Sequence, residues 1–220
     1  MEAVKVMLKT LLAFLLPVMA VAQTAKPVID NERVAVWDIT WNGGPALTLE
    51  FARYDAVVVY LTGGQLKKVS AVSPTTLVTR AAGEVMFLEQ LAVDKLEPVP
   101  GSAPHTAIIF IKTDPLPPIE NKSGSPSAFP RPGGKRVLNN QRFTTWDYSW
   151  TTGQPTPMHF HDKDVVVVYL EDGSLKSTTP DGQSTVNDYT AGAIRWNARD
   201  RVHTEELVKG KQHALITEIK

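Results

Sequence analysis

The sequence repeats itself at an offset of 109 residues, and this repeat restricts the possible folds more than any other feature. The run Val57–Leu61 recurs as Val166–Leu170. The single residues that keep the offset without a gap are Arg33 and Arg142, Trp37 and Trp146, Asp38 and Asp147, Trp41 and Trp150, Gly44 and Gly153, Asp55 and Asp164, Gly64 and Gly173, and Gly83 and Gly192. Strand-like composition alone does not pair tryptophans and glycines in this way. The sequence therefore predicts two copies of one domain.

Each half consists of short runs rich in β-branched and aromatic residues. In the first half, Arg33–Trp41 alternates in hydrophobicity, as expected of a strand with two different faces. Gly63-Gly64 and Asp172-Gly173 are turn signals between such runs. The chain also has 16 prolines and 14 glycines, which suits many turns. We expect an all-β fold of sandwich or barrel type, with helical pattern only at Val6–Val21.

The two halves are joined by Thr113–Arg136, a segment with six prolines and little periodic apolar content. Such composition favours an extended linker. The sequence leaves open whether this linker moves freely or packs along one half. The expected units are residues 23–112, the linker 113–136 and residues 137–220.

The amino terminus has the pattern of a secretory signal peptide, residues 1–22. Lys5 and Lys9 precede an apolar run, Leu11–Ala22, which ends in the small-x-small site Ala20-Val21-Ala22. The run is shorter than the roughly 20 residues that a spanning helix needs, so we expect cleavage after Ala22 rather than an uncleaved anchor. This predicts a periplasmic or secreted protein without stable membrane insertion. The chain has no cysteine, so disulfides do not stabilise it.

Charge excludes one class of partner. The chain has 23 basic and 23 acidic residues. It therefore lacks the excess of positive charge that is typical of proteins that bind nucleic acid.

Two histidines one residue apart mark the candidate site. His159 and His161 precede Asp164 and the β-branched run Val165–Val168. Alternate residues of a strand point to the same face, so both imidazoles are aimed into one space. Protein sites for a single metal ion offer their nitrogens in this way.

These residues resemble the motifs of the cupin superfamily. The first cupin motif is a glycine, five residues, HxH, a carboxylate and a later glycine; here these are Gly153, His159, His161, Asp164 and Gly173. The second motif has a histidine eleven residues after a glycine, as Gly192 and His203 do. The sequence departs from the family in its carboxylate, which is aspartate and follows the second histidine after only two residues. Ala198 and Asp200 also replace the usual proline and glycine.

The resemblance covers Val34–Lys220 as a bicupin, that is, two tandem double-sheet, jelly-roll-like β-barrels. It implies one divalent metal ion (Zn, Mn, Ni or Fe) held by His159, His161 and His203. Asp164 is either a fourth ligand or a hydrogen-bond acceptor for a liganding histidine. Glu50, Ala52 and Asp94 take the places of the histidines in the first half, which is then a structural barrel, with a carboxylate-bound cation as the alternative.

Two further residues are candidates for a catalytic role. Tyr169 is a potential acid or hydrogen-bond donor, or else structural like its repeat mate Tyr60. Arg195 precedes His203 and is matched by Met86 in the other half, so it is a candidate for binding a substrate carboxylate. For Glu205 and Glu206 we expect a solvated pair, with contact to a metal ligand as the alternative.

Three functions remain open from the sequence. The first is a metal-dependent enzyme of oxygenase, decarboxylase or isomerase type, acting on a small polar or carboxylated molecule. The second is a non-catalytic protein that binds a small molecule or uses the metal for structure, and the third is a storage-like bicupin with a vestigial site. Cupins commonly pair their barrels, so we expect a monomer with two facing barrels, or a homodimer.

Overall fold

The computed structural model describes residues 27–43, 47–48, 53–91 and 95–220, and the regular elements in these ranges are all strands. The predicted signal peptide, Gly44, Glu50, Ala52 and Asp94 lie outside the described residues. No membrane-spanning helix is found in the described part of the chain.

The described strands form two sets of nine. The first set is β1 (Pro27–Asp30), β2 (Val34–Thr40), β3 (Leu47–Thr48), β4 (Asp55–Tyr60), β5 (Gly64–Val69), β6 (Thr76–Arg80), β7 (Val85–Leu88), β8 (Lys95–Pro98) and β9 (His105–Ile111). The second set is β10 (Lys135–Asn139), β11 (Phe143–Trp150), β12 (His159–His161), β13 (Asp164–Tyr169), β14 (Gly173–Thr178), β15 (Ser184–Tyr189), β16 (Ile194–Asn197), β17 (Arg201–Gly210) and β18 (Gln212–Ile219).

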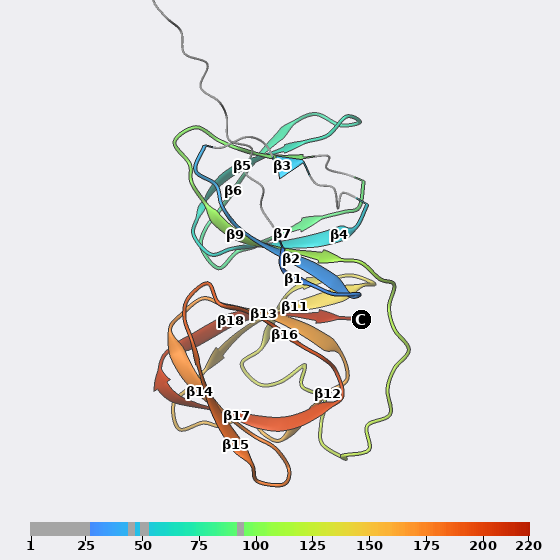
Figure 1. The fold of residues 1–220 in the computed structure, drawn as a ribbon, viewed down its shortest axis with the longest axis vertical. Coiled ribbons are helices and arrows are strands. Elements are labelled where there is room, and N and C mark those ends of the chain that lie inside the picture. The colour runs from blue at the N-terminus through green and yellow to red at the C-terminus, as the bar shows by residue number, and fades with distance from the viewer. Residues whose placement is uncertain (1–26, 44–46, 49–52, 92–94) are drawn as a thin grey trace, which may run out of the picture.

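Both sets build the same pair of antiparallel sheets. The first half has sheets of order β1-β2-β9-β4-β7 and β3-β8-β5-β6, and the second half has β10-β11-β18-β13-β16 and β12-β17-β14-β15. Adding nine to each strand number converts the first pair of sheets into the second. The expectation of an all-β, tandem two-barrel fold is therefore confirmed (Figure 1).

Alternation along the strands divides the apolar residues between three cores. On β2, Ala35 and Ile39 point into the amino-terminal barrel, whereas Val34 and Val36 point out of it. On β11, Trp146 and Trp150 point into the carboxy-terminal barrel, and Phe143 points out. The outward-facing residues of both halves form one shared core, so the two five-stranded sheets pack face to face (Figure 1). This shared core consists of Val34, Val36, Val57, Val59, Ala107, Ile109, Ile111, Phe143, Val166, Val168, Leu215 and Ile219.

Two ion pairs cross between the barrels, and they are related by the repeat. Arg33 Nε lies 3.1 Å from Asp164 Oδ2, and Arg142 Nε lies 3.6 Å from Asp55 Oδ2. Arg33 and Arg142 are repeat mates, as are Asp55 and Asp164. The arginine of each half therefore forms an ion pair with the aspartate of the other half. The constant offset of these residues thus reflects a pseudo-twofold interface between the barrels.

The glycines of the repeat serve this interface as well. Gly83 and Gly192 both have left-handed backbone, with φ of 79° and 87°, which favours glycine. Gly83 faces Leu170 and Gly192 faces Leu61, and these leucines are again repeat mates.

The proline-rich segment does more than connect the barrels. Its second part enters the carboxy-terminal barrel beside β12, where Ala128 N donates to Phe160 O and Phe160 N donates to Pro126 O, each at 2.8 Å. Ala128 and Phe129 are buried. Strand β10 begins at Lys135, inside the range predicted as linker. This segment therefore belongs to the wall of the carboxy-terminal barrel.

Candidate metal centre

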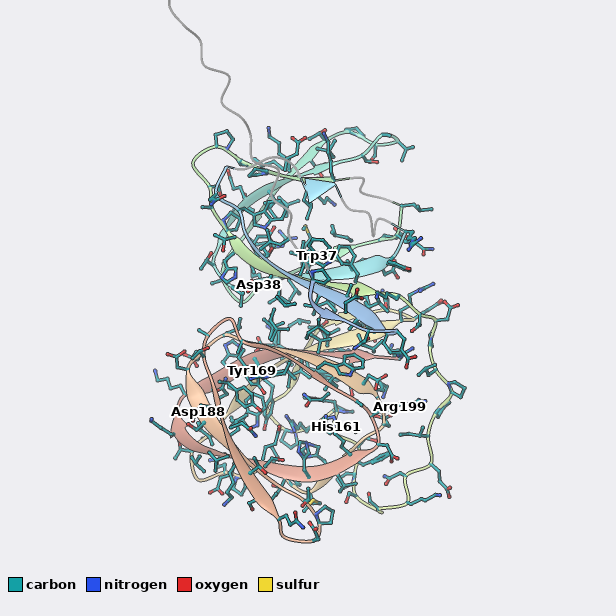
Figure 2. All side chains as sticks on the ribbon, in the orientation of Figure 1. Trp37, Asp38, His161, Tyr169, Asp188 and Arg199 are labelled. Atoms are coloured by element: carbon teal, nitrogen blue, oxygen red, sulfur yellow. The ribbon has the colours of Figure 1, made fainter. Side chains whose placement is uncertain are left out.

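Antiparallel pairing of β12 and β17 brings three histidines together. His159 lies directly opposite His203 in the register, and His161 is two residues further along β12 on the same face. All three side chains are buried, and Figure 2 shows His161 inside the carboxy-terminal barrel. His159 and His203 thus meet because neighbouring strands place opposite residues close to each other, and His161 reaches His203 from the diagonal position on the same face.

The ring nitrogens all lie within 4.8 Å of one another, and two of their separations match those around one metal ion. His159 Nε2 lies 3.2 Å from His161 Nε2, which lies 3.0 Å from His203 Nε2. Nitrogens bound to one tetrahedral ion at about 2.0–2.1 Å would be roughly 3.3 Å apart. The cluster is the one group of three or more potential ligand residues found among the described residues.

Two of the imidazoles are oriented by hydrogen bonds behind them. His159 Nδ1 lies 2.8 Å from the carbonyl oxygen of Pro157, which can only accept, so Nδ1 carries the proton and Nε2 keeps its lone pair. His203 Nδ1 lies 2.8 Å from Ser177 Oγ. His161 Nδ1 is buried and has no hydrogen-bond partner among the described residues. Such contacts behind the ligands fix the ring orientation in metal sites.

The environment keeps all three imidazoles neutral, as metal binding requires. Burial, the largest cause, lowers the pKa of each of them, that of His203 to about 4. Nearby Arg201 and Arg131 lower the pKa of His161 further.

Loss of the Ser177 hydroxyl tests this orientation. We expect Ser177→Ala to weaken zinc binding by about 10–100-fold, because the His203 ring loses the contact that holds it. Isothermal titration with Zn²⁺ measures the change. Thr178→Ala is the control, since that hydroxyl contacts Ser184 and not a histidine. Equal affinity of both variants would contradict the role of Ser177.

Asp164 takes neither of the two places expected from its position in the motif, a fourth ligand or an acceptor for a liganding histidine. Its Oδ2 pairs with Arg33, and its Oδ1 accepts a hydrogen bond of 2.8 Å from the backbone N of Arg199. Both oxygens are engaged in this way, and among the described residues Asp164 accepts no hydrogen bond from a histidine either. The short side chain and the short spacing place this carboxylate with the interface.

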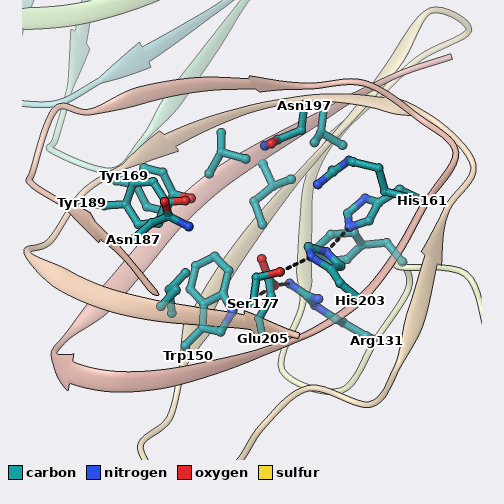
Figure 3. A pocket seen from close by; sticks show the side chains of 16 residues that line it. Arg131, Trp150, His161, Tyr169, Ser177, Asn187, Tyr189, Asn197, His203 and Glu205 are labelled. Atoms are coloured by element: carbon teal, nitrogen blue, oxygen red, sulfur yellow. Dashed lines mark hydrogen bonds and ion pairs between the residues drawn. The ribbon is translucent and has the colours of Figure 1, made fainter. Parts of the chain in front are cut away.

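A cavity of about 130 Å³ opens beside the histidines, enough for about four water molecules. Its polar wall comes from the four-stranded sheet and the proline-rich segment, with Asn197 of β16 in addition, and its apolar wall comes mainly from the five-stranded sheet (Figure 3). The polar side chains are Arg131, His161, Ser177, Asn187, Asn197, Arg201, His203 and Glu205.

Tyr169 lines this cavity at the end away from His161 and His203 (Figure 3). Its ring is stacked on that of Tyr189, with centroids 4.0 Å apart. Burial first, and Tyr189 second, raise the pKa of the Tyr169 phenol far above its usual range. Tyr169 therefore offers a neutral hydroxyl and an aromatic face. Its repeat mate Tyr60 is also buried, and burial raises the pKa of that phenol to about 12.

Arg195 is not among the residues that line the cavity. Its side chain is exposed, and its guanidinium carbon lies 5.9 Å from the centre of the Tyr189 ring. The arginines of the cavity are Arg131 and Arg201 instead.

Glu205 is a partly buried partner of Arg131, not half of a solvated pair. Its Oε2 lies 3.4 Å from Arg131 Nη2 and accepts a hydrogen bond of 3.1 Å from Trp150 Nε1. Burial alone would raise the pKa of Glu205, but Arg131, the histidines and the Trp150 hydrogen bond together lower it. Arg201, His203 and Glu205 are alternate residues of β17, so strand alternation from His203 predicts that Arg201 and Glu205 also point into the barrel. The family motifs alone do not include these two residues. Arg131 carries no such signal, because it lies in a segment without periodicity.

Comparison with known proteins identifies the fold. No family model and no curated protein matches the sequence. Among solved structures, a cupin 2 conserved barrel domain protein from Leptotrichia buccalis is 12% identical, with 89% of this chain and 88% of that chain covered and a TM-score of 0.55. A single-residue variant of oxalate decarboxylase from Bacillus subtilis is also 12% identical, with 86% of this chain and 69% of that chain covered and a TM-score of 0.56.

Proposed function

We propose that this chain, which has the fold of a two-barrel cupin, is a metal-dependent enzyme that acts on a small carboxylate in its carboxy-terminal barrel. The observation that carries the proposal is a cluster of three histidines beside a cavity, with His161 and His203 of the cluster lining it together with two arginines. The pattern of the amino-terminal segment further supports action after export.

The donor set suits a divalent ion. His159, His161 and His203 would supply three neutral nitrogens, which leaves positions open for water or substrate. When bound, such an ion polarises a carboxylate or carbonyl oxygen, or activates water. Imidazole ligands suit zinc, nickel and iron, whereas manganese, the fourth ion considered, prefers oxygen ligands. One of the Bacillus subtilis oxalate decarboxylase structures is described by its Mn(II) centres, which supports manganese among these.

Arg201 is the residue that favours an anionic substrate. It lies opposite His161 in the register of β12 and β17 and lines the cavity. Its Nε donates to the carbonyl of Ala198 at 2.7 Å, and it forms no ion pair with any carboxylate in the described ranges. Burial, the largest cause, lowers the pKa of its guanidinium. A bound carboxylate would compensate this charge and accept a forked pair of hydrogen bonds.

Replacing Arg201 tests the proposed function. We expect Arg201→Gln to weaken the binding of small carboxylates to the zinc-loaded protein by about 30-fold or more, because the charged partner of the carboxylate is lost. Titration calorimetry with acetate, lactate and malonate measures this. Arg195→Gln removes an exposed arginine outside the cavity and is the matched control.

Either of two results would overturn the proposal. One is that none of these carboxylates binds the metal-loaded wild-type protein, and the other is that both arginine variants bind them equally well. Binding without turnover in a screen of small carboxylates would instead favour the non-catalytic alternative.

A further inference from the structure

Charge changes sign along the wall of the cavity. Arg201, His203 and Glu205 are alternate residues of β17, so they share one face, and all three line the cavity. The Cα atoms of Arg201 and Glu205 are about 13 Å apart at the usual rise of a strand. A positive group and a negative group therefore lie on the two sides of the metal-ligand position.

Glu205 is held as a fixed hydrogen-bond acceptor. Trp150 and Arg131 both contact its Oε2, at 3.1 Å and 3.4 Å, whereas its Oε1 accepts no hydrogen bond from the residues that the structure describes. Arg131 is itself fixed, because its guanidinium lies over the Phe129 and Tyr148 rings, 4.5 Å and 4.0 Å from their centres. One carboxylate oxygen thus remains for a ligand.

Glu205 Oε1 can accept a hydrogen bond from a donor on the ligand, and Arg131 does not occupy this oxygen. Its Nη2 contacts Glu205 Oε2, and its Nη1 lies 3.4 Å from His159 Nε2, a contact that a metal ion on this nitrogen would replace. No hydrogen bond joins Arg131 to Oε1 among the residues that the structure describes. A ligand group that meets Oε1 is therefore next to an acceptor with negative charge. A hydroxyl or an ammonium group suits this place, and a second carboxylate would face like charge.

We infer that the substrate is a monocarboxylate that carries a hydrogen-bond donor, a hydroxyl or an ammonium group, with its carboxylate at Arg201 and its donor at Glu205 Oε1. This inference rests on the proposed function and restricts it: dicarboxylates are selected against. A cavity of about 130 Å³ suits a small ligand of this kind.

Ligand ranking on the zinc-loaded wild-type protein tests this inference without any substitution. We expect lactate or alanine to bind at least about tenfold more tightly than propanoate, which lacks the donor, and more tightly than malonate, whose second carboxylate would face Glu205. The lactate and alanine arms separate a hydroxyl from an ammonium group. If malonate or propanoate binds as tightly as both donors, the inference is wrong.

A specificity change in Glu205→Gln provides the second test. The amide keeps the size of the side chain and an oxygen for Trp150 but removes the charge, so we expect malonate to gain and alanine to lose about tenfold in affinity relative to wild type. Glu206→Gln is the matched control, because Glu206 is the next residue of β17 and pairs with Lys176 at 2.7 Å outside the cavity.

The two proposals fail in different ways. Unchanged ratios of malonate to alanine affinity in Glu205→Gln, together with a loss of both in Arg201→Gln, would overturn the substrate class alone. Absence of carboxylate binding to the wild-type protein would overturn the proposed function. Circular dichroism and bound zinc establish that each variant is folded before it is compared.

Discussion

Replacing His203 with alanine is expected to abolish stoichiometric metal binding. The variant loses one of three ligands, and β17 has no other histidine on that face. We therefore expect the affinity for zinc to fall by at least about 100-fold, which is more than the loss of a hydrogen bond to a liganding histidine causes. Metal analysis of dialysed protein and titration with Zn²⁺ measure this. His213→Ala is the control, because His213 pairs with Asp147 at 2.6 Å and is not part of the cluster.

The same variant should remove the dependence of stability on metal. A ligand that binds only the folded state stabilises it by about 2.7 kcal/mol at a free concentration of about 100 times its Kd. A chelator should therefore lower the Tm of the wild-type protein and of His213→Ala, and leave that of His203→Ala unchanged. One equivalent of tightly bound metal in His203→Ala would contradict the candidate metal centre.

Breaking the Arg33–Asp164 pair is expected to cost about 3–5 kcal/mol of unfolding free energy, because it leaves an uncompensated buried charge. The two side chains are only 6% and 7% exposed. Urea unfolding of Arg33→Gln and Asp164→Asn measures the loss. In the more exposed pair of Lys95 and Glu97, the side chains are 39% and 29% exposed, and Glu97→Gln should cost about 0–1 kcal/mol.

Metal analysis of Asp164→Asn separates the two roles considered for this residue. The interface role predicts full metal content in a less stable protein, whereas a ligand role predicts loss of metal. If Arg33→Gln proves as stable as Glu97→Gln, the interface does not depend on this ion pair.

Most of the fold could be predicted from two kinds of signal, the strand and turn patterns within short stretches and the repeat between the two halves. Alternation and turn residues mark strands within a few positions, and a constant offset shows that whatever the first half forms, the second forms too. The pairing of His159 with His203 followed from the family resemblance. The register of β12 and β17 then supplies its physical cause.

The roles of Asp164 and Arg131 could not be predicted, because each depends on contact between segments that the sequence does not relate. Asp164 meets Arg33 across 131 positions, at an interface that exists only once both barrels are formed. Arg131 lines the cavity because the proline-rich segment pairs with β12 through Ser127 and Phe160. The sequence of this segment has no periodic pattern that predicts the pairing. Arg195 shares a face of β16 with Asn197, but only Asn197 is close enough to the cavity to line it.

The swapped ion pairs have a consequence for how such a chain can arise. If two identical copies of the carboxy-terminal half docked as the halves dock here, Arg142 of each copy would meet Asp164 of the other, and both bridges would form. The docking surface lies on the five-stranded sheet, while the histidines lie on the four-stranded one. If the chain arose by fusion of two genes for a symmetric dimer, one half could lose its metal ligands while the interface between the halves stayed intact.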